Sequence, residues 1–278
     1  KGPALAQSLF GDSNLRACSD LDLLIPRAKL AAAVELLGPY GYQSGVPRWV
    51  LDSSLLDHGI QLALHRSAGA VDYVVEFHWS LFQNAALETH GLRSIWEEAG
   101  CGLFHGAPHR TLSPEWQLLY LAVHAGRHNW QGLKWLVDID AATAVTPHLD
   151  WHRITALARE MEWDQVSRWT LGACHALLET PLPADIPFEP PHRLEKLVGN
   201  LNSSNERVAT LLPLLRAQKS FWGILGLIGN KLFRPTPAEF ARYPLPRWLR
   251  HLYFALRPVR LLQTAAGDLL RKKPKESN

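Results

Sequence analysis

Two aspartates separated by one leucine, Asp20 and Asp22, form the pattern in this sequence with the clearest chemical meaning. They open an alternation of acidic and apolar residues that runs to Ile25 and is typical of a strand with one polar and one buried face. Both carboxylates would then lie on one side of the strand, where they could share a hard divalent cation such as Mg²⁺. The alternative is an exposed strand whose acids are merely solvated.

A third carboxylate, Glu76, lies in an apolar stretch that also predicts a strand. Burying an unpaired carboxylate is costly, so Glu76 needs a cation or a hydrogen-bonding partner. The alternative to a metal ion is a salt bridge to Arg16 or Arg66. His78 follows two residues later on the same side, where it could touch a substrate or orient Glu76.

The chain begins with a glycine turn and a short helix that predict a binding site for phosphate. Gly2 lets backbone amides approach an anion closely, and Pro3 suits the first turn of the helix that follows. The N-terminus of a helix favours negative charge. A phosphate-binding turn would therefore lead, through one helix, into the strand of Asp20 and Asp22.

Together these residues resemble a known family. The resemblance rests on Lys1-Gly2, Arg16, the run Ser19-Asp20-Leu21-Asp22-Leu23-Leu24 and the run Val75-Glu76-Phe77-His78-Trp79. They are similar to the uncharacterised bacterial nucleotidyltransferase-like family within the DNA polymerase beta superfamily. The resemblance implies a turn that holds the triphosphate of an NTP, and three carboxylates on a small mixed sheet that bind two metal ions. In this chain Pro3, rather than a serine, follows the glycine.

The resemblance also implies a role for each matching residue. Asp20, Asp22 and Glu76 would be the catalytic carboxylates and would hold Mg²⁺ or Mn²⁺. The residues expected around the nucleotide are Lys1, Gly2, Arg16, Ser19 and His78, with Lys1, Gly2 and Ser19 cradling phosphate.

A helix predicted after Ser113 carries His124 and His128, and the segment beyond it carries Lys134 and Asp138. The two histidines have the spacing of zinc ligands, but a zinc protease would need glutamate after the first, and Ala125 follows His124. A similar run occurs in the family, which implies that His124, Lys134 and Asp138 face the nucleotide, with Lys134 meeting phosphate. Alternatively, Lys134 and Asp138 form a helix salt bridge, or these residues brace two domains.

The predicted elements indicate an α/β (α+β) fold. A helix over 27–37 and an antiparallel hairpin over 60–79 would complete a small mixed sheet, and helices dominate from residue 113 onward. We expect a nucleotidyltransferase-like catalytic domain over 1–100, a helical domain over 101–215 and a basic, aromatic-rich segment over 216–278.

Composition indicates a globular chain. Of 278 residues 47% are hydrophobic, and 11 are tryptophan. The first residue is lysine, from which we expect a missing N-terminal segment. Three scattered cysteines, Cys18, Cys101 and Cys174, are too few for a disulfide framework and fit a reducing cytoplasm.

The last segment differs from the rest in charge. Residues 216–278 contain roughly 13 lysines and arginines against 3 acidic residues, interleaved with aromatic and apolar ones. This composition suits a peripheral contact with an anionic membrane surface, at its inner face. RNA or a protein would be alternative partners, but no nucleic-acid motif is present. A segment that simply packs on the helical domain is a further alternative.

The sequence thus predicts an enzyme, a metal-dependent nucleotidyltransferase that transfers a nucleoside monophosphate from an NTP to an unknown acceptor hydroxyl. The first alternative is a non-catalytic adaptor that keeps this fold and docks on a membrane or a protein partner. The second is a metal-dependent phosphohydrolase that uses the same carboxylates.

Overall fold

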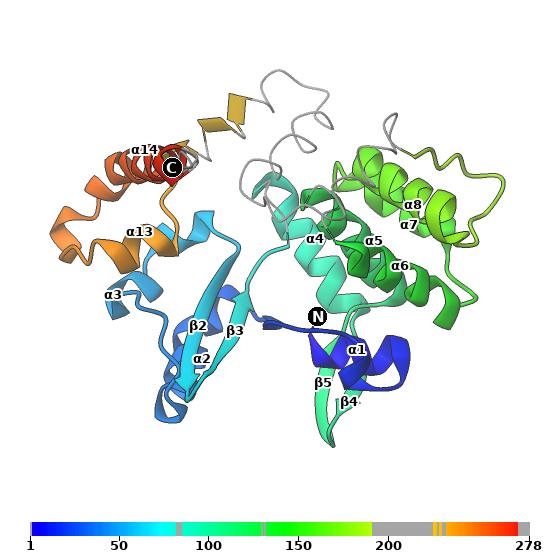
Figure 1. Cartoon of the computed structure of the whole chain (residues 1–278), viewed down its shortest axis with the longest axis horizontal. Helices are drawn as coiled ribbons and strands as arrows, with labels where there is room; N and C mark the ends of the chain where they lie inside the picture. Colours follow the sequence, from blue (N-terminus) through cyan, green and yellow to red (C-terminus); the bar gives the residue numbers. More distant parts are fainter. Residues whose placement is uncertain are drawn as a thin grey trace, which may run out of the picture. The chain divides into compact units, whose positions relative to one another are not determined.

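The computed structural model describes residues 2–81, 85–128, 130, 132–190, 225–226, 228–229 and 232–271. Two compact units divide the chain (Figure 1). One combines Lys1–Cys18 with Asn84–Phe221, and the other combines Ser19–Gln83 with Trp222–Asn278. We call them the helical unit and the sheet unit. The domain boundaries expected near residues 100 and 215 stay a prediction. The sequence also predicts helices over 193–201 and 207–219, which lie outside the described residues.

The sheet unit is built on three strands, β1 (Leu21–Leu24), β2 (Gln61–Ala68) and β3 (Val71–His78). Their order is β1-β3-β2, with β1 parallel and β2 antiparallel to β3. The two longer strands form the predicted hairpin, whose turn uses Gly69 at φ 63°. The small mixed sheet expected from the sequence is therefore confirmed.

Helices from both ends of the sheet unit cover its core. They are α2 (Leu30–Leu37), α3 (Arg48–Leu51), α13 (Pro237–Arg242) and α14 (Leu252–Arg271), with 3₁₀ turns at Arg27–Lys29, Gly38–Tyr40, Ser54–His58 and Arg247–Leu249. Leu62 and Phe77 of the sheet belong to one buried cluster with Phe240 of α13 and Tyr253 of α14. Helices α13 and α14 of the C-terminal segment therefore pack on the sheet unit, since they share its contiguous apolar core.

The helical unit contains α1 (Pro3–Phe10), α4 (Ala85–Glu98), α5 (Pro114–Arg127), α6 (Leu133–Val145), α7 (Trp151–Glu160) and α8 (Asp164–Leu178), and a 3₁₀ turn at Ser13–Leu15. Ser113 caps α5 as predicted, because its hydroxyl accepts a hydrogen bond from the backbone N–H of Trp116. The core joins Leu5 and Leu9 of α1 to apolar residues of the later helices. The first helix of the chain is thereby fixed to helices more than 100 residues later.

A second hairpin was not predicted. Residues expected to form a turn-rich connector pair as β4 (Gly100–Phe104) and β5 (Ala107–Thr111). Positive φ angles at His105 and Gly106, 48° and 78°, make the tight turn between them. The sequence signal was a two-residue loop that contains glycine, but the proline, histidine and arginine that follow it do not form an apolar run, so the segment is easily read as a loop alone.

Among the described residues, no helix combines the length and the apolar character needed to cross a membrane.

Candidate functional site

The sheet places Asp22 and Glu76 next to each other. Asp22 of β1 lies opposite Glu76 of β3 in the parallel register, so both side chains project from the same face of neighbouring strands. His78, two residues along β3, shares that face. One potential ligand atom from each of the three residues lies within 4.8 Å of the others. We call Asp22, Glu76 and His78 the acidic cluster.

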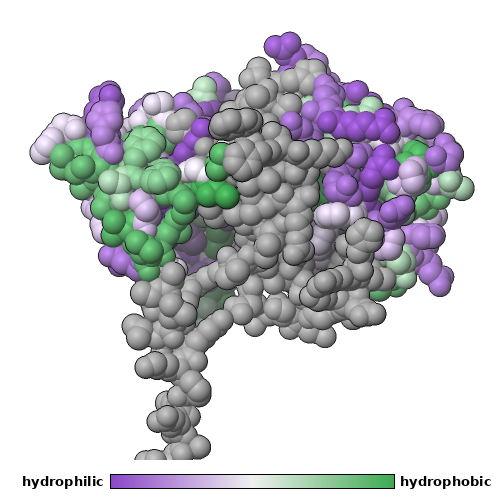
Figure 2. Space-filling view, turned by 90° about the horizontal axis from the view of Figure 1, so that it is seen from above, coloured by the Kyte–Doolittle hydropathy of each residue, from purple (hydrophilic) through white to green (hydrophobic). Residues whose placement is uncertain are grey.

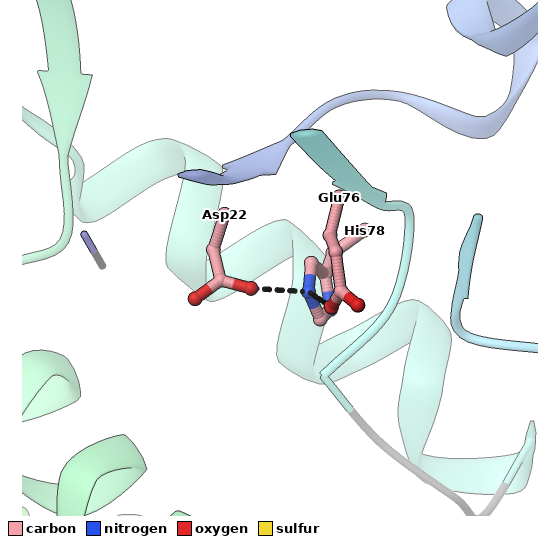
Figure 3. Close-up of side chains that lie close together, drawn as sticks. All are labelled: Asp22, Glu76 and His78. Atoms are coloured by element: carbon pink, nitrogen blue, oxygen red, sulfur yellow. Dashed lines mark hydrogen bonds and ion pairs between the residues drawn. The ribbon is translucent and has the colours of Figure 1, made fainter. Parts of the chain in front are cut away.

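The imidazole of His78 lies between the two carboxylates (Figure 3). Its Nε2 is 2.9 Å from Asp22 Oδ1 and 3.4 Å from Glu76 Oε2. The side-chain amide of Gln61 on β2 donates a hydrogen bond of 2.6 Å to Glu76 Oε2. Strands β1 and β3 therefore supply the acidic cluster, and β2 supplies a hydrogen-bond donor to it.

The acidic cluster stabilises positive charge. Burial lowers the pKa of His78, but hydrogen bonds to Asp22 and Glu76 and their negative charges together raise this pKa above its usual value. Two carboxylates about 4 Å apart repel each other by about 4 kcal/mol at an effective dielectric constant of about 20. A cation at this position, whether imidazolium or metal, relieves that repulsion.

The donor set fits a divalent metal ion. Asp22 and Glu76 are only 15% and 20% exposed, and carboxylate oxygens are the ligands that Mg²⁺ and Mn²⁺ prefer. The described residues place no lysine or arginine within ion-pair distance of Glu76. Arg16 pairs elsewhere, and the guanidinium of Arg66 lies 5.9 Å from the ring centroids of Tyr42 and Tyr73. The salt bridges considered for Glu76 are thus not formed.

Asp20, the first aspartate of the motif, is not a member of this cluster. It lies just before β1, whose pairing with β3 starts at Leu21 opposite Val75, so strand pairing does not fix the position of Asp20. Its role as a metal ligand stays a prediction. Ser19 is exposed and lies in the same segment before β1.

The glycine turn belongs to the helical unit. Gly2 is buried and has φ 83° and ψ −151°, a conformation that glycine adopts easily and other residues avoid. Pro3 occupies the first position of α1, as predicted. Lys1 lies outside the described residues, so its contact with phosphate remains untested.

Arg16 and Asp138 form a buried ion pair in the helical unit. The Arg16 guanidinium donates three hydrogen bonds of 2.8, 3.0 and 2.9 Å to the Asp138 carboxylate. Their side chains are 8% and 1% exposed. Burial lowers the pKa of Arg16, whereas the hydrogen bonds and charge of Asp138 raise it, and the net effect is an increase. Asp138 is thus paired with Arg16 rather than with Lys134.

The remaining predicted residues gather around Trp135. The ring centroids of His124 and His128 lie 5.6 and 4.7 Å from that of Trp135 and 4.5 Å from each other. Lys134 is exposed, and its Nζ lies 5.8 Å from the Trp135 ring centroid. This arrangement is an aromatic cluster at the junction of α5 and α6.

A comparison with protein families identifies the chain. Residues 1–179 match the sequence model of a family described as an uncharacterised nucleotidyltransferase. The chain belongs to this family. Searches of curated proteins and of solved structures found no match. The matched nucleotidyltransferase region includes the acidic cluster, the Arg16–Asp138 pair and the glycine turn.

Two contacts of the site were not anticipated. Gln61 lies opposite His78 in the hairpin register, which places it diagonal to Glu76. Counting back from the turn at Gly69 would have revealed that position. The pairing of Arg16 with Asp138 joins residues 122 positions apart, and no local pattern in the sequence signals it.

Proposed function

We propose that this chain is a metal-dependent nucleotidyltransferase that transfers a nucleoside monophosphate from an NTP to an acceptor hydroxyl. One observation carries the proposal. Asp22 and Glu76 lie side by side on parallel strands, with His78 between them, in a chain of a nucleotidyltransferase family. This arrangement concentrates negative charge where a divalent cation and the phosphates it binds would be held.

The carboxylates of the sheet unit have the central roles in this proposal. Asp22 and Glu76 would hold Mg²⁺ or Mn²⁺, and Asp20 would add a third carboxylate. His78 orients Asp22 through its 2.9 Å contact, and Gln61 orients Glu76. Bound metal ions would stabilise charge on the attacking and leaving oxygens of the transfer.

The proposed nucleotide contacts include both exposed and buried residues. Lys1, Gly2 and Ser19 would cradle phosphate, and the exposed Lys134 would meet it, with His124 nearby. Arg16 and Asp138 bond to each other, which supports a role in positioning the surrounding backbone rather than in direct contact.

The reaction exchanges one phosphorus–oxygen bond for another. The acceptor oxygen attacks the α-phosphorus of the NTP, the bond from that phosphorus to the bridging oxygen breaks, and pyrophosphate leaves. The acceptor's proton passes to solvent. Because little covalent chemistry is required of the protein, its residues act by positioning charge. We also propose a cytoplasmic location, which the three scattered cysteines support.

The test uses NTPs labelled on the α-phosphate, Mg²⁺ and a bacterial cell extract as the source of acceptors. We expect wild type to release pyrophosphate and to label an acceptor, and Asp22→Asn to lose both activities. Asp72→Asn is the matched control, because Asp72 is an exposed residue on the same face of β3, about 13 Å from Glu76.

Two results would contradict the proposal. Labelled nucleoside monophosphate as the sole product would indicate the phosphohydrolase. No pyrophosphate release by the folded chain would favour the non-catalytic adaptor.

A further inference from the structure

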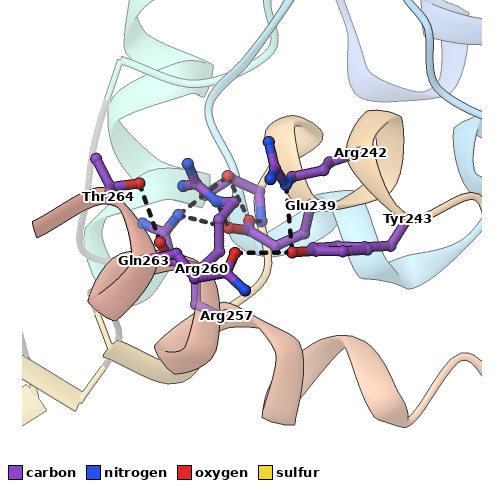
Figure 4. A network of polar contacts seen from close by, with 8 residues as sticks. Glu239, Arg242, Tyr243, Arg257, Arg260, Gln263 and Thr264 are labelled. Carbon is purple, nitrogen blue, oxygen red and sulfur yellow. Dashed lines mark hydrogen bonds and ion pairs between the residues drawn. The ribbon is translucent and has the colours of Figure 1, made fainter. Parts of the chain in front are cut away.

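The long C-terminal helix α14 points two arginines toward the protein. Arg257 and Arg260 follow the buried Tyr253 at helical spacings of four and seven residues, so all three share one face. Both arginines bond to Glu239 of α13, whose side chain is fully buried (Figure 4). Glu239 thus holds the inward face of α14, which carries Arg257 and Arg260, against α13.

This orientation is fixed by several contacts. Thr236 donates hydrogen bonds of 2.7 Å from its backbone N–H and 2.6 Å from its hydroxyl to the second oxygen of Glu239. The hydroxyl of Tyr253 donates to the Tyr243 carbonyl at 2.7 Å and accepts from the backbone N–H of Leu245 at 2.9 Å. Turning α14 about its axis would break the contacts of Arg257, Arg260 and Tyr253 and leave the buried Glu239 carboxylate without its two arginines.

The opposite face of α14 is apolar and open to solvent. Leu252, Val259 and Leu262 are 47%, 45% and 71% exposed, and Ala255 is exposed between them. Their spacings of three, seven and ten residues describe one side of a helix. Figure 2 shows hydrophobic residues gathered on the side of the molecule where α14 lies. An apolar helix face of this kind needs a covering partner.

Positively charged residues flank α14 in the sequence. Trp248, 76% exposed, precedes α14 between the exposed residues Arg247 and Arg250. The two acidic residues of 232–271 are Glu239, which is buried and paired, and Asp268. The sequence after the helix adds Lys272, Lys273 and Lys275. The combination of leucine, tryptophan and arginine matches the boundary between lipid headgroups and acyl chains.

We propose that the exposed face of α14, with Trp248 and the flanking arginines, docks on a membrane surface that carries anionic lipid headgroups. The helix lies in the plane of the surface and buries Leu252, Val259 and Leu262 among the acyl chains. A second copy of the chain that paired through the same face would set two positively charged surfaces against each other, which like charges disfavour. A nucleic acid would contact the arginines but leave the leucines exposed to water.

Vesicle co-sedimentation of the full chain tests this proposal without any nucleotide. We expect binding to vesicles of phosphatidylcholine mixed with phosphatidylglycerol, weaker binding at high salt and little binding to phosphatidylcholine alone. The Val259→Gln/Leu262→Gln variant should bind at least about tenfold more weakly, since both changes remove apolar surface. Each of Arg247→Gln and Arg250→Gln should weaken binding about fivefold.

The matched control is Leu103→Gln, because Leu103 of β4 is 71% exposed, like Leu262, but lies in the helical unit. It should bind as wild type does, and thermal unfolding should show that every variant is folded. Equal binding of wild type and the Val259→Gln/Leu262→Gln variant would overturn the proposal. So would equal binding to neutral and anionic vesicles, or a wild-type chain that dimerises in solution and ignores vesicles.

Discussion

The buried pair of Arg16 and Asp138 allows a quantitative test of how the helical unit is held together. Asp138→Ala would leave the Arg16 guanidinium, 8% exposed, without the carboxylate that accepts three of its hydrogen bonds. Leaving one member of a buried ion pair unpaired costs about 3–5 kcal/mol. We therefore expect the free energy of unfolding to fall by that amount in urea denaturation followed by circular dichroism.

An exposed pair provides the control. Arg48 and Asp52 lie 2.7 Å apart, close to the 2.8 Å of the buried pair, but their side chains are 52% and 61% exposed. Asp52→Ala should therefore change the free energy of unfolding far less than Asp138→Ala does. If Asp138→Ala costs no more than Asp52→Ala, the buried pair does not stabilise the unit as we reason.

A double variant separates the pair from its members. Replacing both residues, as Arg16→Met/Asp138→Leu, removes the unpaired charge and should recover most of the lost stability. Additive losses in the double variant would contradict a direct coupling of the two side chains.

Three further predictions concern other buried groups. Burial raises the pKa of Glu239, but its hydrogen bonds to Thr236 and two arginines lower it below the usual value. Glu239→Gln should therefore lower the free energy of unfolding by about 3 kcal/mol at neutral pH. The difference in unfolding free energy between this variant and wild type should shrink below about pH 4, where the carboxylate of wild type is protonated. A difference that does not depend on pH would refute this prediction. Gly126→Ala should lower the free energy of unfolding by about 1–3 kcal/mol, because the added Cβ would lie 2.1 Å from a side-chain carbon of α8. The control Gly38→Ala meets no described atom within 4 Å and should be nearly neutral. Equal stability of the two variants would refute this prediction. Burial raises the pKa of the Cys174 thiol and keeps it away from solvent. A thiol reagent should therefore label the exposed Cys101 far faster than Cys174 in the folded chain. Similar labelling rates for the two cysteines would refute this prediction.

Local patterns in the sequence predicted the elements that position the acidic cluster. An apolar, strand-like run indicated β3, the turn at Gly69 indicated its pairing with β2, and the acidic residue within that run marked Glu76. The sequence also placed His78 on the face of Glu76, where the structure has it. These features depend on neighbours within a strand or a hairpin, which is why they could be predicted.

Features that depend on distant contacts could not be predicted. Nothing near Arg16 indicates that its partner is Asp138, because the pair forms only when α1 and the segment after it pack on α6. In the sequence Asp20 seemed equivalent to Asp22. The pairing of β1 with β3 starts at Leu21, however, so it does not fix the position of Asp20. In α14 the arginines and leucines were visible, but tertiary contacts with Glu239 decide that the arginines face inward.

The most direct test of the central claim is a calorimetric titration of each NTP, with and without Mg²⁺, into wild type, Asp22→Asn and Asp72→Asn. Our account predicts metal-dependent binding to wild type and to Asp72→Asn, and its loss in Asp22→Asn. Unchanged, metal-dependent binding to Asp22→Asn would contradict the claim that Asp22 and Glu76 hold the metal ion of a nucleotide site.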